Sequence, residues 1–332
     1  MNNKISMKEI AGLAGTSVAT VSRVINGNGR FSKETEKRVR EIIEQYDYHP
    51  NLLAKGLRED RMKVIGVIVP DVSSDFFIGI VRAMERELYP HGYMTVLCDT
   101  AESEEAESAF IGMLGNMRFS GIVYVGGKRS QTIFKDVPVL YIDRKPGSVR
   151  TETNCCFIGS DNYMGGRLAA RRLLDAGRTN PAIVLFDEQF ELETQIRRLH
   201  GFRSVLAEHG IILRDSMIYY VQQVDYESGV LVTERILSAD PAHDAVFYTS
   251  DILAIGGIQY LDAHGVSIPD EISLIGMDDI PLSARINPPL TTIRQQYAEF
   301  GRLAAASMLR MLSGETLEDQ VLPVQLVERG TV

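Results

Sequence analysis

The chain has 332 residues, of which 45% are hydrophobic and 24% charged, and its formal net charge is −9. This length is enough for two or three domains, and the composition is that of a globular protein rather than a disordered one. No apolar run reaches the roughly 18 residues of a membrane span, and the first residues, MNNKIS, lack a signal peptide's apolar core, so we expect a cytoplasmic protein. Three cysteines, Cys98, Cys155 and Cys156, are too few for a disulfide scaffold, and no His-rich or Cys-rich spacing predicts a metal site.

The charge is divided unevenly along the chain. Residues 1–63 hold 12 Lys and Arg against 8 Asp and Glu, whereas residues 64–332 hold 23 against 36. The first segment therefore carries +4 and the remainder −13, which together give the formal −9. A basic head on an acidic body suits contact with phosphates at one end of the chain only.

Residues 6–27, SMKEIAGLAGTSVATVSRVING, predict two short helices joined at a glycine. Ser6 and Glu9 form the S-x-x-E pattern of a capping box at the start of the first helix. Gly15 permits a tight turn, and Ser17 can cap a second helix that runs to about Asn26.

The second helix has two distinct faces. Because residues three and four apart are neighbours on a helix, Val21, Val24 and Ile25 fall on one face, and Ala19, Thr20 and Arg23 on the opposite one. The small side chains of the second group let the helix approach a flat partner closely, and an arginine can bond a guanine edge with two hydrogen bonds. This pattern predicts a helix-turn-helix DNA reader, and the alternative is a three-helix bundle with a solvated charged face.

A third helix is predicted from Lys33 to about Tyr46, after a cap at Ser32. Pro50 interrupts the chain, and residues 51–58 are too short to form a stable isolated helix in water. Without further information this segment is a plain linker.

The segments SVATVSRVING and YHPNLLAKGL together resemble the DNA-binding headpiece of the LacI/GalR repressors, at the separation that this family uses. The resemblance implies that Val18, Ala19, Thr20 and Arg23 read bases in the major groove, while Ser17, Ser22 and Asn26 mainly hold phosphates. It also implies a hinge that becomes ordered on operator DNA. There Leu57, with Ala54 and Lys55 beside it, would wedge between base pairs in the minor groove.

From Lys63 onward, apolar strand-like runs alternate with amphipathic helical stretches, which predicts a parallel α/β architecture. The predicted strands are 63–70, 93–98, 121–125, 137–142, 182–186, 217–221, 245–248 and 272–277. The predicted helices are 76–91, 103–117, 163–176, 194–209, 226–238 and 252–264. So many strands favour two similar lobes.

The resemblance implies that the body consists of two doubly wound lobes like a type I periplasmic binding protein, between which the chain crosses several times. We therefore divide the chain into a helix-turn-helix headpiece at 1–50, a hinge at 51–62 and an effector-binding and dimerisation domain at 63–332. Within that domain, lobe one is about 64–159 and 292–324, and lobe two is about 160–290.

A ligand is expected between the lobes, because open α/β sheets bind ligands beyond the carboxyl ends of their strands. Polar residues follow directly on several predicted strands, among them Asp143, Asp161, Ser250, Asp251 and Asp278. We expect Asp161 and Asp251 to cap the next helix rather than to contact a ligand.

The resemblance singles out two of the remaining residues. Arg198 lies in RRLHGF and Asp278 in SLIGMDD, which are similar to the family's R-x-x-G-F helix and G-[YF]-D-D strand end. Phe77 matches an aromatic residue on which a flat ligand can stack, or else it belongs to the core. Ser250 departs from the Asn of some sugar-binding members. The candidate effector-binding residues are Phe77, Asp143, Arg198, Ser250 and Asp278.

Taken together, these features predict a ligand-controlled transcription repressor that binds a pseudo-palindromic operator as a homodimer. A carbohydrate or sugar derivative is the first choice of effector; a nucleobase, a nucleoside or a protein corepressor is the alternative. An enzyme is the rival class, but the sequence lacks G-x-S-x-G, Walker, H-E-x-x-H, CxxC and G-x-G-x-x-G motifs, and no cofactor is expected. A third class is a ligand sensor that has lost DNA binding, which the intact recognition helix argues against.

Overall fold

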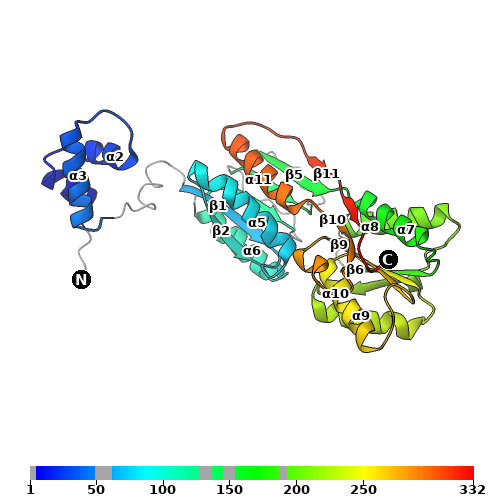
Figure 1. Cartoon of the computed structure of the whole chain (residues 1–332). Helices are drawn as coiled ribbons and strands as arrows, with labels where there is room; N and C mark the ends of the chain where they lie inside the picture. Colours follow the sequence, from blue (N-terminus) through cyan, green and yellow to red (C-terminus); the bar gives the residue numbers. More distant parts are fainter. Residues whose placement is uncertain (1–4, 49–61, 118, 127–136, 145–153, 187–192) are drawn as a thin grey trace. The chain divides into compact units, whose positions relative to one another are not determined.

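The computed structural model describes residues 5–48, 62–117, 119–126, 137–144, 154–186 and 193–332. The contacts within the chain divide it into two units, residues 1–62 and residues 63–332. Figure 1 shows a small helical unit at the amino-terminal end and an α/β body.

The headpiece contains three helices, α1 (Met7–Leu13), α2 (Val18–Asn26) and α3 (Lys33–Gln45). Serine caps all three, and Ser6 forms the predicted reciprocal capping box with Glu9. Gly27 ends α2 with a φ of +65°, a left-handed conformation that glycine adopts without steric cost. The common core of the three helices consists of Ile10, Ala11, Ala14, Val21, Val24 and Val39. The helix-turn-helix arrangement predicted from the sequence is therefore confirmed.

The body contains two six-stranded sheets. The first has the order β11-β5-β4-β3-β1-β2, and the second β12-β10-β9-β8-β6-β7. In the second sheet all neighbours are parallel except β10 and β12. The strands of the first sheet are β1 (Met62–Val69), β2 (Met94–Asp99), β3 (Phe119–Val125), β4 (Val139–Ile142), β5 (Cys155–Ser160) and β11 (Gln320–Leu322). Those of the second are β6 (Pro181–Phe186), β7 (Ile218–Val221), β8 (Ala245–Tyr248), β9 (Ser273–Asp278), β10 (Thr291–Arg294) and β12 (Gln325–Val327).

Helices cover both faces of each sheet (Figure 1). On the first sheet, α5 (Asp75–Leu88) and α11 (Tyr297–Leu312) pack on one face and α6 (Glu104–Asn116) on the other. On the second sheet, α7 (Asn162–Asp175) and α8 (Glu193–Glu208) cover one face, and α9 (Tyr226–Ala239) and α10 (Asp251–Ala263) cover the other. The short 3-10 helices are η1 (Tyr89–His91), η3 (Asp215–Met217) and η4 (Pro281–Ala284).

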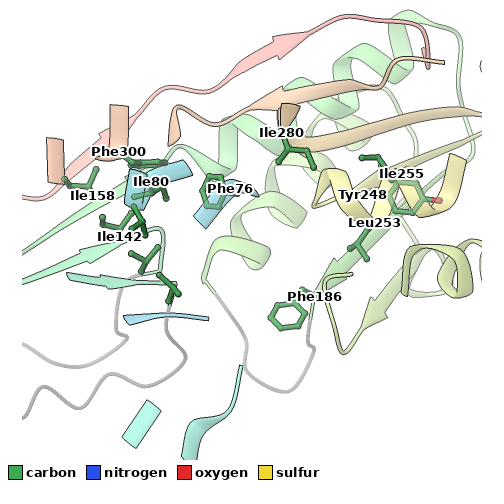
Figure 2. Packing of buried hydrophobic residues seen from close by; sticks show 14 of the residues in the cluster. Phe76, Ile80, Ile142, Ile158, Phe186, Tyr248, Leu253, Ile255, Ile280 and Phe300 are labelled. Atoms are coloured by element: carbon green, nitrogen blue, oxygen red, sulfur yellow. The ribbon is translucent and has the colours of Figure 1, made fainter. Parts of the chain in front are cut away.

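One hydrophobic cluster extends from the first sheet to the second. Figure 2 shows Phe76, Ile80 and Phe300 on the first-sheet side and Tyr248, Leu253 and Ile255 on the second-sheet side. Strands with apolar residues on both faces are expected where helices cover a parallel sheet from both sides. The two-lobed α/β fold predicted from the sequence is confirmed.

The chain crosses between the sheets three times, after β5, β10 and β11. These crossovers bond to one another: the Asp161 amide donates to the Leu322 carbonyl at 2.9 Å, and Gln296 Nε2 donates to the Pro323 carbonyl at 2.9 Å. Strand β10 pairs in the second sheet, so the chain leaves that sheet after Arg294.

Several elements of the body were not predicted from the sequence, among them the short strands β11 and β12. Three further missed elements lie within or beside the two sheets. They are β5, β10 and the long helix α11. None of the helices in the described part of the chain combines the length and hydropathy that a membrane crossing requires.

Candidate DNA-binding face and ligand cavity

The second helix of the headpiece presents the face expected from its sequence. Ala19 and Arg23 are exposed, and Thr20 is partly exposed, whereas Val21 and Val24 are buried. Ser17 is exposed at the cap, where its Oγ accepts from the Thr20 amide at 3.1 Å. Of the other predicted DNA contacts, Ser22 and Val18 are partly buried, and Asn26 is the last residue of α2. Ala54, Lys55 and Leu57 lie outside the described residues.

A glycine in the following loop lies against the predicted base-reading arginine. Gly29 has a φ of +97°, and a Cβ atom there would lie 2.9 Å from Arg23 Cδ. The side chain of Arg23 therefore occupies space that the Cβ atom of any other residue at position 29 would fill. Gly29 was not among the residues predicted from the sequence, although a glycine three residues after the end of α2 indicates a tight loop there.

The body contains a cavity of about 370 Å³. All five candidate effector-binding residues, Phe77, Asp143, Arg198, Ser250 and Asp278, line it. They come from both lobes and lie at the carboxyl ends of strands or on the helices that follow, which is where open α/β sheets bind ligands.

Arg198 is held on α8 at the cavity wall and is 5% exposed. Its Nε donates to Asn162 Oδ1 at 2.7 Å, and one terminal nitrogen donates to the Thr249 carbonyl at 2.8 Å. Burial lowers the pKa of Arg198, an effect that the nearby Asp143 and Asp278 oppose. Among the described residues Nη2 has no hydrogen-bond partner, so this nitrogen can donate to a ligand.

The position of Arg198 depends on close contact between α7 and α8. A Cβ atom on Gly166 would overlap the carbonyl oxygen of Arg198 and lie 2.7 Å from the Phe202 amide nitrogen. On the facing helix, a Cβ atom on Gly201 would overlap the carbonyl oxygen of Tyr163. The two glycines let the helix backbones touch, which brings the arginine to the cavity.

Asp278 is the most strongly perturbed of the cavity carboxyls. It has a φ of +123°, and its carboxyl oxygens accept from Gln295 Nε2 at 2.7 Å and Ser250 Oγ at 3.2 Å. Burial raises the pKa of Asp278 to about 8, the charge of nearby Asp251 adds to this effect, and Arg198 opposes it. Ser250 thus contacts the cavity carboxyl instead of capping α10.

Asp143 and Arg144 form the part of the cavity floor that belongs to the first sheet. Asp143 is 6% exposed, and its Oδ1 is buried without a hydrogen-bond partner among the residues that the structure describes. Arg144 Nε lies 3.9 Å from Asp143 Oδ2, but its Nη1 donates to the Gly126 carbonyl at 2.6 Å and its Nη2 lies 3.6 Å from Glu102 Oε1. The Arg144 guanidinium also stacks over the ring of Phe186, 5.5 Å from its centroid.

Aromatic rings line the cavity from both sides. Phe77 is partly buried and packs edge-on against Phe76, with ring centroids 5.3 Å apart. Phe76 extends from the first-sheet side and Phe186 from the second (Figure 2). The Phe77 ring packs against Gly126, where a Cβ atom would lie only 3.0 Å from the ring. The lack of a side chain at Gly126 therefore leaves room for the ring.

The two predicted capping aspartates differ in role. Asp161 caps α7, since its Oδ1 accepts from the Met164 amide at 2.9 Å, as expected. The prediction for Asp251 was wrong, because this residue is the first of α10 and fully buried. Its carboxylate instead accepts from the Ile280 amide at 2.9 Å, Ser283 Oγ at 2.7 Å and Thr292 Oγ1 at 2.5 Å. These hydrogen bonds attach the loop that follows β9 to strand β10.

Several polar residues of the cavity region were missed from the sequence. They are Asn162, Gln195, Thr249 and Gln295. Gln295 follows the short strand β10, so recognition of TTIR as a strand would have pointed to it. Within the described ranges, no group of three or more His, Cys, Asp or Glu side chains could hold a metal ion.

The chain is similar to known proteins over nearly its whole length. Residues 6–51 match the domain described as bacterial regulatory proteins, lacI family, and residues 170–332 match a periplasmic binding protein-like domain. The HTH-type transcriptional repressor PurR of Histophilus somni is 30% identical over 335 residues, which cover 98% of each protein. The lac repressor bound to ONPG in its repressed state aligns with a TM-score of 0.86 and 25% identity, over 99% of this chain and 100% of that one. The transcriptional regulator CelR in complex with cellobiose aligns with a TM-score of 0.72 and 26% identity over the same shares.

Proposed function

The chain belongs to the LacI family of bacterial transcription regulators, a family without enzymatic activity, and on that premise we propose that it is a cytoplasmic repressor of a pseudo-palindromic operator. The observation that carries the proposal is that one chain holds two separate binding surfaces. One is the exposed face of α2, and the other is the buried cavity lined by Phe77, Asp143, Arg198, Ser250 and Asp278. We assign residues 1–50 to the headpiece, 51–62 to the hinge, and 63–332 to ligand binding and dimerisation.

On operator DNA, the face of α2 enters the major groove. Val18, Ala19, Thr20 and Arg23 contact base edges, and Ser17, Ser22 and Asn26 contact phosphates, which sets the register of the helix. Arg23 supports this role best, because its guanidinium is exposed beside short side chains. In the hinge, we assign Ala54, Lys55 and Leu57 to the minor groove, with Leu57 as the residue that would wedge between base pairs.

A homodimer gives the protein the same twofold symmetry as a pseudo-palindromic site. The first sheet offers a surface for it. Its edge strand β2 and the end of α6 expose large apolar side chains, namely Met94, Val96, Leu97, Met113 and Met117. Such a patch on an unpaired sheet edge is typical of a protein interface.

A sugar or sugar derivative is the effector that the cavity suits best. Carboxyl groups at Asp143 and Asp278 can accept hydrogen bonds from hydroxyl groups, and Arg198 Nη2 can donate one. The Phe77 ring offers an apolar face on which a sugar ring can stack. In the solved relative CelR, the ligand named is cellobiose.

A nucleobase or nucleoside is the second candidate. The presence of several aromatic rings around one cavity favours it, since flat bases stack on such rings. A protein corepressor is a third prediction, and no contact among the described residues favours it.

Ligand binding would change operator affinity if the ligand prefers one arrangement of the two lobes. A coupling of about 1–3 kcal/mol between the two sites is typical of such regulators. The test is selection of operator DNA from random inverted repeats with the full chain, followed by fluorescence anisotropy with and without sugars and nucleosides. No preference for any inverted repeat at moderate salt would contradict the DNA-binding role.

The cavity is tested by Asp278→Ala. This variant should keep operator binding and lose the response to any ligand found by thermal-shift screening, because a ligand that binds only the folded protein raises its melting temperature. The matched control is Asp175→Ala, an exposed aspartate at the end of α7 that does not line the cavity. A response retained by Asp278→Ala would place the ligand elsewhere.

A further inference from the structure

The described residues around the cavity carry far more negative than positive groups. Seven carboxyl side chains line it, against two guanidinium groups. The carboxyl groups belong to Asp71, Asp75, Glu102, Asp143, Asp225, Glu227 and Asp278, and the guanidinium groups to Arg144 and Arg198. An anionic ligand would meet this field on entering, whereas a neutral or cationic ligand would not be repelled.

Helix dipoles offset this charge only in part. First-turn residues of α5, α8, α9 and α10 line the cavity, so four helix amino-terminal ends lie near it. Each such end is equivalent to about half a positive charge. Even with the carboxyl group of Asp278 neutral, four half-charges and two guanidinium groups leave the described lining negative.

Two buried acceptors in the lining lack donors. Within the described part of the chain, Asp143 Oδ1 and Gln295 Oε1 have no hydrogen-bond partner, and the two side chains are 6% and 2% exposed. Both residues line the cavity. Arg144 does not donate a hydrogen bond to Asp143 Oδ1. The Arg144 guanidinium is held by the Gly126 carbonyl and by Glu102, and Arg144 Nε lies 3.9 Å from Asp143 Oδ2. Since an unpaired buried acceptor is costly, a bound molecule is expected to supply the hydrogens.

We infer that the cavity takes a ligand without an anionic group, whose hydroxyl or amino hydrogens bond Asp143 and Gln295, and that a protonated amine on this ligand strengthens its binding. The inference rests on the proposed ligand-binding role of the cavity and narrows it to neutral and amino-substituted polyols or nucleosides. Phosphorylated sugars and nucleotides fit this inference poorly, because their phosphate would approach several carboxylates, with two guanidinium groups among the described lining residues to balance them.

The charge of the cavity can be measured without knowing the ligand. The chain has no tryptophan, so a single introduced tryptophan, excited at a wavelength that tyrosine does not absorb, is the only source of tryptophan emission. Tyr226→Trp and Leu282→Trp each place this probe in the cavity lining, and Tyr89→Trp places it on an exposed site outside that lining. Two cavity probes keep the measurement possible if one variant folds poorly. Quenching by the caesium cation and by the iodide anion is compared at constant ionic strength. Quenching by neutral acrylamide measures how accessible each tryptophan is to solvent.

The ratio of caesium quenching to iodide quenching should be severalfold higher at the cavity probes than at Tyr89→Trp. Adding Asp75→Asn and Glu227→Gln, which remove two of the exposed lining carboxylates, should reduce that preference. Equal quenching, or stronger quenching by iodide, would overturn the inference. Operator binding plays no part in this assay, so its result is independent of whether the protein is a repressor.

The ligand itself is tested with matched sets in thermal-shift and calorimetric titrations of the full chain. The sets are glucose, glucosamine and glucose 6-phosphate; galactose, galactosamine and galactose 6-phosphate; and adenosine with its monophosphate. In either sugar set that binds, the amine should bind more tightly than its parent. In any of the three sets that binds, the phosphorylated member should bind at least tenfold more weakly than its parent. A phosphorylated member that binds as tightly as its parent would refute the inference, and if no set binds, the quenching ratio alone decides.

Discussion

The exposed face of α2 and the ligand cavity are both proposed binding surfaces, but they are built in opposite ways. Ala19, Thr20 and Arg23 come from a single helix and project outward. The cavity side chains come from segments more than two hundred residues apart and are held in a buried network, as Arg198 and Asp278 show. DNA contacts can therefore be changed with little effect on folding, whereas a change at the cavity also changes stability.

The largest effect is expected where α7 and α8 touch. Gly166→Ala should lower the free energy of unfolding by about 3 kcal/mol, because the new Cβ overlaps the backbone of α8 and the helices must separate. Gly112→Ala is the matched control, since this glycine lies in the exposed part of α6 with no atom within 4 Å of an added Cβ. There, alanine should stabilise the helix by about 0.5–1 kcal/mol. Urea unfolding followed by circular dichroism measures both, and equal effects would show that the glycine contact does not matter.

The next effect concerns the pH dependence of the body's stability. The pKa of Asp278 is raised from 3.8 to about 8, so the folded protein holds a proton that the unfolded chain releases between about pH 4 and pH 8. This contribution is fully present at the acid end of that window and is lost as pH rises, with a slope of at most about 1.4 kcal/mol per pH unit.

Asp278→Asn should remove this slope, so the stability of the variant relative to wild type should increase from pH 5 to pH 8. Unfolding by urea at both values measures the difference, and Asp175→Asn, at an exposed carboxyl, is the control. A relative stability that falls with pH would contradict the raised pKa.

The exposed face is tested by Arg23→Ala. Loss of the guanidinium should cost about 1–3 kcal/mol of discrimination at one base pair per half-site, because a paired arginine–guanine contact is worth that much. Lys37→Ala removes the same charge from the exposed side of α3 and should weaken binding equally for all sequences. Anisotropy with a set of single-base operator variants separates the two. If Arg23→Ala keeps the same base preference, Arg23 does not contribute to the recognition of base sequence.

The smallest effect is expected at the glycine beside Arg23. Gly27 and Gly29 both have positive φ, so alanine at either should cost the headpiece about 1 kcal/mol of stability. Only at Gly29 would the added Cβ also displace the Arg23 side chain. Gly29→Ala should therefore reduce operator affinity a few-fold more than Gly27→Ala, measured by anisotropy at a temperature where both variants are folded. Equal losses would mean that the loop does not position the arginine.

The headpiece could be predicted from sequence because its determinants are local. The capping box of Ser6 and Glu9 and the buried stripe of Val21 and Val24 depend on residues a few positions apart. In the body, strand runs and helical periodicity indicated the two-lobed architecture. Family resemblance, rather than spacing, pointed to Arg198 and Asp278.

The remaining features of the cavity depend on contacts that no local pattern contains. The role of Asp251 depends on Ser283 and Thr292, which are more than thirty positions away. Gln295 was missed because β10 is only four residues long and does not form a clear apolar run. The positive φ angles of Asp143 and Asp278 follow from the loops they belong to and leave no trace in their sequence.

The three crossovers between the sheets are bonded to one another at Asp161, Gln296 and Pro323. Because these hydrogen bonds couple the three crossovers, we expect any opening or closing of the body to use them together as one hinge. Gln295, with its free acceptor in the cavity, belongs to the middle crossover. A molecule bound there is attached at the pivot itself, where a small displacement produces a large movement at the far ends of the two halves.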